Sequence, residues 1–113
     1  MLKIYGIKNC DTVKRSRKWL DDHGYEYSFH DFRNDGLDSE LLDRLAGKIG
    51  WDTLINRRGT TWRQLPESAR ENLDEGRAKQ LMLEHPTLIK RPVIEMDNRF
   101  TAGFSPDFFA TKS

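Results

Sequence analysis

The sequence contains a single cysteine, Cys10, among its 113 residues. One cysteine cannot form an internal disulfide, so the small secreted scaffolds that several disulfides hold together are excluded. The opening residues 1–5 are too few for the apolar core of a secretion signal. We therefore expect a cytoplasmic protein in a reducing compartment.

Long hydrophobic runs and an excess of charge of one sign are lacking as well. No purely apolar run is longer than three residues, whereas a membrane helix needs about 20. The net charge is +1, which gives no basic field for nucleic acid. The histidines are too scattered for a metal site, and no glycine-rich phosphate loop is present. We expect no membrane, nucleic acid, bound metal or bound cofactor.

The first third of the chain predicts a strand, a helix and a second strand. Residues 2–5 favour a strand, and a helix is expected from Cys10 or Asp11, with Asp11 or Thr12 as its cap. Residues 25–32 alternate between aromatic and polar side chains, which is typical of a strand. Parallel strands joined by a crossover helix fit this length.

The rest of the chain predicts a helical block followed by a hairpin. Residues 37–49 show helical spacing with Asp38 as cap, and further helices are expected at 51–54 and 74–84. Two short strands, 92–96 and 99–102, would form a hairpin before a final short helix. The order predicts an α/β (α+β) single domain over 1–113, in which a helical insertion of about 37–85 interrupts a sheet formed by about 1–33 and 87–113.

Cys10 is the first candidate functional residue. It falls where a strand turns into a helix, and the unpaired N–H groups of a helix start favour a thiolate, the reactive form of cysteine. Lys8 and Lys14 are close enough in sequence to help. The alternative is a small buried core residue, which is common for cysteine.

Two basic segments are the next candidates. Arg91 precedes Pro92 and could bind an oxyanion or a carboxylate with its planar guanidinium, and the Arg91–Pro92 bond could be cis or an ordinary trans bond. The segment 56–62 combines two arginines with two hydroxyls beside a glycine. It could contact an anion or a thiol tripeptide, or form only a solvated loop.

These segments together resemble the ArsC (arsenate reductase) and Spx family of thioredoxin-fold proteins, most closely its YffB-like members. The resemblance rests on four stretches in the right order, which are Tyr5-Gly6-Ile7-Lys8-Asn9-Cys10-Asp11-Thr12, Leu54-Ile55-Asn56-Arg57-Arg58-Gly59-Thr60-Thr61-Trp62, His85-Pro86-Thr87-Leu88-Ile89-Lys90-Arg91-Pro92-Val93 and Gly103-Phe104-Ser105-Pro106.

The resemblance implies a thioredoxin/glutaredoxin-like mixed four-stranded sheet and a set of site residues. Cys10 would be the catalytic nucleophile, with Thr12 and Pro92 among the residues that bind the substrate or its anion. Arg91 would bind the substrate anion, and Arg58 would be the middle arginine of the family. Pro92 is expected to be cis and to face the cysteine.

Departures from the family pattern shape the expected function. Gly6 stands where arsenate reductases have a histidine, and Gly103-Phe104 where they have a third arginine. We therefore expect a thiol-dependent reductase that uses glutathione as co-substrate, or a glutaredoxin as partner, with arsenate reduction weak or absent. We expect it to act as a monomer.

Two alternatives stay open. One is an Spx-like regulator that binds the C-terminal domain of the RNA polymerase α-subunit, although Val13 stands where Spx proteins carry the second cysteine of a Cys-x-x-Cys. The other is a thioredoxin-fold protein whose site has lost its activity.

Overall fold

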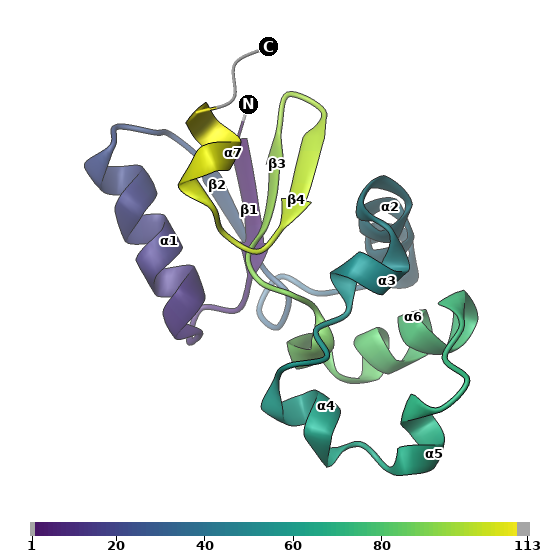
Figure 1. The fold of residues 1–113 in the computed structure, drawn as a ribbon. Helices are drawn as coiled ribbons and strands as arrows, with labels where there is room; N and C mark the ends of the chain where they lie inside the picture. The colour runs from purple at the N-terminus through teal and green to yellow at the C-terminus, as the bar shows by residue number, and fades with distance from the viewer. Residues whose placement is uncertain (1, 111–113) are drawn as a thin grey trace. The chain divides into compact units, whose positions relative to one another are not determined.

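The computed structural model describes residues 2–110, and of Ala110 only the backbone. The ends of the expected domain, residues 1 and 111–113, lie outside the described residues. In chain order the elements are β1 (Leu2–Gly6), α1 (Asp11–Asp22), β2 (Ser28–Asp31), α2 (Ser39–Ile49), α3 (Trp51–Leu54), α4 (Thr60–Gln64), α5 (Glu67–Arg70), α6 (Glu75–Glu84), the 3₁₀ helix η1 (Pro86–Leu88), β3 (Val93–Met96), β4 (Arg99–Ala102) and α7 (Pro106–Ala110) (Figure 1). The chain divides into two compact units, residues 1–35 with 91–113, and Gly36–Lys90.

The first unit contains a mixed four-stranded sheet with the order β2-β1-β3-β4 (Figure 1). β1 runs parallel to β2 and antiparallel to β3. β3 and β4 form the expected hairpin, whose turn residues Asp97 and Asn98 have φ angles of 51° and 69°. Such left-handed angles suit Asp and Asn in a two-residue turn. The predicted mixed four-stranded sheet is confirmed.

One hydrophobic cluster of this unit lies on one face of the sheet. Ile4 and Ile94 are opposite each other across β1 and β3, and both are fully buried. They form one hydrophobic cluster with Leu20 of α1 and Phe109 of α7. Both helices therefore cover the same face, and burial of these side chains fixes α1 against the sheet.

The second unit is built from the helices α2 to α6 and η1. Asp38 and Asp74 cap α2 and α6, each accepting a backbone N–H bond of 2.8 Å three residues further on. Lys79 of α6 forms ion pairs with Asp43 of α2 at 3.1 Å and with Glu75 at 2.8 Å. The helices expected at 51–54 and after Asp74 are confirmed.

Two local predictions about the first unit were wrong. The N-cap of α1 is Cys10 in extended conformation, and Asp11 and Thr12 already lie inside the helix. The strand expected over 25–32 is limited to Ser28–Asp31. The backbone N–H of Tyr25 is instead used to end α1, because it donates to the Leu20 carbonyl at 2.9 Å. No helix among residues 2–110 is long and apolar enough to cross a membrane.

Candidate functional site

Several predicted site residues lie in segments that adjoin the same end of the sheet in the first unit. β1 ends at Gly6, which pairs with Asp31 at the end of β2. β3 runs the other way and begins with Val93 opposite Tyr5. The turn that leads to Cys10, the end of β2 and the segment before Val93 are therefore neighbours at this end of the sheet.

Cys10 closes a tight turn and opens α1. Its backbone N–H donates to the carbonyl of Ile7 at 3.1 Å, and its own carbonyl accepts the N–H of Lys14 at 2.9 Å. Cys10 itself is partly exposed. Because the first N–H groups of a helix have no partner inside the helix, they and the helix dipole favour an anion here. The buried-core alternative for Cys10 is excluded, since a partly exposed residue is not a core residue.

Lys8 and Thr12, on either side of Cys10, are exposed. Thr12 is the second residue of α1, and its carbonyl accepts the hydroxyl of Ser16 at 2.7 Å. The predicted role of Thr12 in binding stays a prediction. Thr12 lies two residues after Cys10 inside the helix, and not at the cap position that the sequence offered for it.

Asp31 is a site residue that sequence reasoning missed. It is only 4% exposed, and its Oδ2 accepts the backbone N–H of Lys8 at 3.0 Å. Its Oδ1 accepts the N–H groups of Arg33 at 2.8 Å and Asn34 at 3.1 Å. Burial acts to raise the pKa of Asp31, but these N–H bonds and the charge of Arg33 outweigh it, so the pKa is lowered. The carboxylate is therefore ionised at neutral pH.

Gly6 allows α1 to approach the end of β1. A Cβ atom at this position would lie 2.8 Å from Cγ2 of Val13 and 3.7 Å from the ring of Phe29. Val13 is fully buried, so it has no room to move aside. The packing of α1 thus explains why a histidine, as in arsenate reductases, has no space at Gly6. It also shows that the position of a second Cys-x-x-Cys sulfur is occupied by a core side chain.

The Arg91–Pro92 bond is cis, which confirms this prediction. Pro92 is buried and Arg91 is half-buried. The carbonyl of Pro92 accepts the N–H of Gly103 at 2.8 Å, which extends the β3–β4 pairing to this end of the sheet. That Arg91 and Pro92 face Cys10 stays a prediction.

The second unit carries the other predicted basic residue, Arg58, in an exposed turn. The Arg58 backbone N–H donates to Oδ1 of Asn56 at 3.0 Å. The neighbouring Arg57 is held by an ion pair with Asp52, and its guanidinium lies 5.6 Å from the ring centre of Trp62. The Arg58 side chain is exposed, so of the two arginines it is the one available to a ligand.

A hollow of about 310 Å³ surrounds this turn. Its lining residues are Asp52, Thr53, Ile55, Asn56, Arg57, Arg58 and Lys90. Lys90 was not predicted as a site residue. It is brought there by a short antiparallel bridge, in which its N–H donates to the Leu54 carbonyl at 2.8 Å. The only sequence signal for it was its position directly before Arg91.

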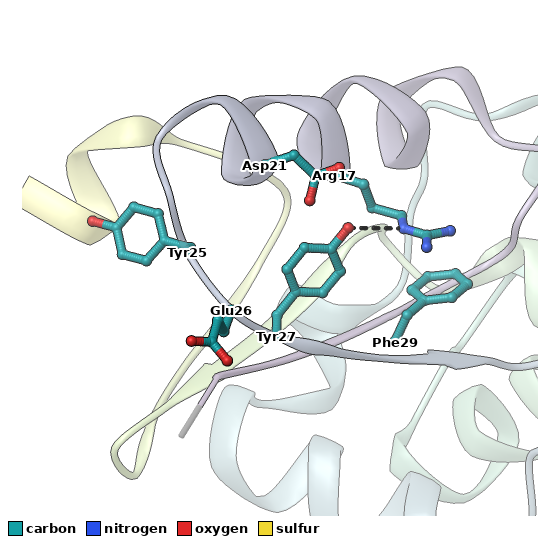
Figure 2. A pocket seen from close by; sticks show the side chains of 6 residues that line it. All are labelled: Arg17, Asp21, Tyr25, Glu26, Tyr27 and Phe29. Carbon is teal, nitrogen blue, oxygen red and sulfur yellow. Dashed lines mark hydrogen bonds between the residues drawn. The ribbon is translucent and has the colours of Figure 1, made fainter.

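Another hollow, of about 400 Å³, lies between α1 and β2 of the first unit (Figure 2). Arg17 reaches over Phe29, with its guanidinium carbon 4.2 Å from the ring centre, and its Nε donates to the Tyr27 hydroxyl at 3.2 Å. No predicted site residue lines this hollow. The Arg17 guanidinium already contacts the Phe29 ring and the Tyr27 hydroxyl, so we do not assign this hollow to the site.

These features define a class of protein. A mixed four-stranded sheet, a lone cysteine at the start of the first helix and a cis-proline before the third strand describe a thioredoxin-like protein with a single cysteine. Within residues 2–110, no three or more His, Cys, Asp or Glu side chains are grouped so that they could hold a metal ion.

The chain belongs to the ArsC family, whose model matches residues 5–111. A solved YffB protein is 48% identical with a TM-score of 0.89, covering 97% of this chain and 96% of that chain. An arsenate reductase (ArsC) related protein from Brucella melitensis is 51% identical with a TM-score of 0.81, covering 96% and 90%. The global transcriptional regulator Spx 2 of Oceanobacillus iheyensis is 30% identical over 111 residues, covering 94% of this chain and 78% of that protein. The resemblance noted in the sequence is confirmed.

Proposed function

We propose that this ArsC-family protein is a thiol-dependent reductase in which Cys10 is the nucleophile and glutathione is the co-substrate. One observation supports this most. Cys10 is partly exposed, and it opens α1 from a turn closed by its own N–H bond to Ile7. The unpaired N–H groups at a helix start interact favourably with an anion, and a partly exposed cysteine is accessible to a substrate sulfur.

The proposed reaction consists of two thiol–disulfide exchanges. The Cys10 thiolate attacks one sulfur of a disulfide, an S–S bond breaks, and a thiolate leaves while Cys10 forms a mixed disulfide. A glutathione thiolate then attacks the other sulfur of that mixed disulfide and releases Cys10 as thiolate. Because Cys10 is the single cysteine of the sequence and Val13 stands at the second position of a Cys-x-x-Cys, no internal thiol could resolve the adduct, and an external thiol is needed.

Basic residues would bind the carboxylates of glutathione. Arg58 and Lys90 line one hollow of the second unit, and the acid beside them, Asp52, is already paired with Arg57. Arg91 of the first unit is half-buried and would bind an anion with its planar guanidinium. Extended glutathione has two carboxylates, so separate basic residues suit it better than they suit a compact oxyanion.

Arsenate is the less favourable substrate in this proposal. The third arginine of arsenate reductases is replaced by Gly103-Phe104, and the packing of Val13 leaves no space for a side chain at Gly6. Each charge-assisted hydrogen bond contributes about 1.5–3 kcal/mol. Losing one would lower the rate about tenfold or more.

Intact mass spectrometry after incubation with oxidised glutathione tests the proposal. We expect one glutathione adduct on the wild type, none on Cys10→Ser, and slower formation on Arg91→Ala. Arg57→Ala is the matched control, because its guanidinium is already paired with Asp52. A wild type that forms no adduct would refute the proposal.

A second candidate function is docking on RNA polymerase. It is favoured by one observation, the 30% identity to the transcriptional regulator Spx 2. A pull-down with the C-terminal domain of the polymerase α-subunit separates the two functions. Binding by the wild type and by Cys10→Ser alike, together with no glutathione adduct, would favour the regulator.

A further inference from the structure

The chain buries one carboxylate that the proposed reaction does not use. Asp31 is the acidic residue among those that the structure describes as buried. A buried ion is costly unless hydrogen bonds satisfy it. Three backbone N–H groups, from Lys8, Arg33 and Asn34, supply these bonds.

The bond to Lys8 joins two distant parts of the first unit. Arg33 and Asn34 directly follow Asp31 in the chain, so their bonds shape only the local turn after β2. Lys8 is 23 residues away in sequence and lies between Ile7 and Cys10, whose carbonyl and N–H close the turn before α1. Oδ2 of Asp31 therefore holds the turn that presents Cys10.

We propose that Asp31 is a positioning residue for Cys10, which fixes the Ile7–Cys10 turn through the Lys8 N–H so that the sulfur stays at the start of α1. The inference rests on the proposed function only in taking Cys10 as the reactive group. The lowered pKa of Asp31 keeps the acceptor charged at neutral pH, and hydrogen bonds to a charged group are stronger than neutral ones.

Asp35 provides a comparison within the same region. Its Oδ2 accepts the N–H of Asp31 at 2.8 Å, and its own N–H donates to the Asp31 carbonyl at 2.7 Å. Asp35 thus stabilises the turn after β2 without touching the Cys10 turn. A change at Asp35 should alter stability alone, whereas a change at Asp31 should alter stability and the reactivity of Cys10.

The test compares Asp31→Asn with Asp35→Ala under conditions where both variants are folded. Asparagine keeps one oxygen for Arg33 and Asn34, but its NH₂ group would face the Lys8 N–H. We expect alkylation of Cys10 by iodoacetamide at neutral pH to slow about tenfold or more in Asp31→Asn. It should stay within about twofold of wild type in Asp35→Ala. Iodoacetamide needs no glutathione, so this result is independent of whether the proposed reductase function holds.

Amide hydrogen exchange on the wild type gives a second measurement that needs no variant. The Lys8 amide should exchange more slowly than that of Asn9, its exposed neighbour in the same turn. Equal exchange at Lys8 and Asn9, or equal alkylation of Asp31→Asn and wild type, would overturn the proposal. So would an equal slowing in Asp31→Asn and Asp35→Ala.

Discussion

The turn that precedes Cys10 and the turn that carries Arg58 differ in the side chains that hold them. The first is closed by its own hydrogen bond and anchored from β2 by the buried Asp31. The side-chain bonds of the second are local, with Asn56 accepting the N–H of Arg58 and Asp52 pairing with Arg57. Its distant partner is reached through the backbone, where the N–H of Asn56 donates to the Leu88 carbonyl at 2.7 Å.

This difference matches two requirements of a thiol site, a fixed nucleophile and a group that binds the charged ligand. A nucleophile must keep one position, and buried partners from distant parts of the chain provide that. A group that binds a flexible charged ligand gains more from being free in solvent, because it then makes its ion pair with the ligand and not with the protein. Mutations in the first turn should therefore alter structure and reactivity, and mutations in the second mainly affinity.

The largest effect on the first turn is expected from Gly6→Ala. A Cβ here would lie 2.8 Å from Val13 Cγ2, and such overpacking costs about 1–3 kcal/mol. Thermal or urea unfolding should show this loss of free energy of unfolding. Gly47→Ala is the matched control, since nothing lies within 4 Å of a Cβ at Gly47 in α2, and alanine should stabilise that helix by about 0.5–1 kcal/mol. Equal stability of Gly6→Ala and wild type would show that α1 does not depend on the close approach.

In the second turn, Arg58→Ala should weaken glutathione binding about tenfold, the cost of one charge-assisted contact. Calorimetry of S-methylglutathione binding to the Cys10→Ser protein measures this without any thiol reaction. Lys90→Ala should act in the same direction. Arg57→Ala should leave the affinity unchanged and cost at most about 1 kcal/mol in stability, as expected for an exposed ion pair. Equal losses of affinity for Arg57→Ala and Arg58→Ala would remove the distinction between the two arginines.

The smallest effect concerns the pH dependence of stability from Asp31. Its pKa in the folded protein is below the ordinary aspartate value of 3.8, so the unfolded chain binds the proton more tightly. The stabilisation is present above pH 3.8 and is lost as pH falls through the lower folded value. The difference in free energy of unfolding between wild type and Asp31→Asn should therefore shrink as pH falls below about 4. A difference that stays constant over this range would mean that Asp31 titrates alike in both states.

Much of this could be predicted from the sequence where local signals decide the structure. Asp38 caps its helix as expected, a helix follows Asp74, and Asp97-Asn98 makes the hairpin turn. The Cys10 and Arg91–Pro92 segments could be predicted as site segments because a cysteine and an arginine have reactive or charged side chains, and because the two segments occur in the same order as in the family. The cis bond before Val93 was expected from the resemblance to the family.

The missed features depend on contacts between distant residues. Asp31 appears in the sequence as one more acid after a strand, and only the folded chain brings it to Lys8. Lys90 reaches the Arg58 turn through a bridge between Ile55 and Ile89. The strand expected from Tyr25 onward was too long, since Tyr25 ends α1 instead. The alternation of side chains in the sequence does not show that a backbone N–H, here that of Tyr25, is hydrogen-bonded to the end of the preceding helix.

The most direct measurement of the central claim runs two reactions side by side on one preparation. Intact mass spectrometry monitors formation of the glutathione adduct. Consumption of the reductant that regenerates glutaredoxin monitors arsenate turnover. The account predicts a single adduct that is absent in Cys10→Ser, together with weak or absent arsenate turnover. Robust arsenate turnover without any detectable adduct would contradict it and would make this chain an arsenate reductase proper.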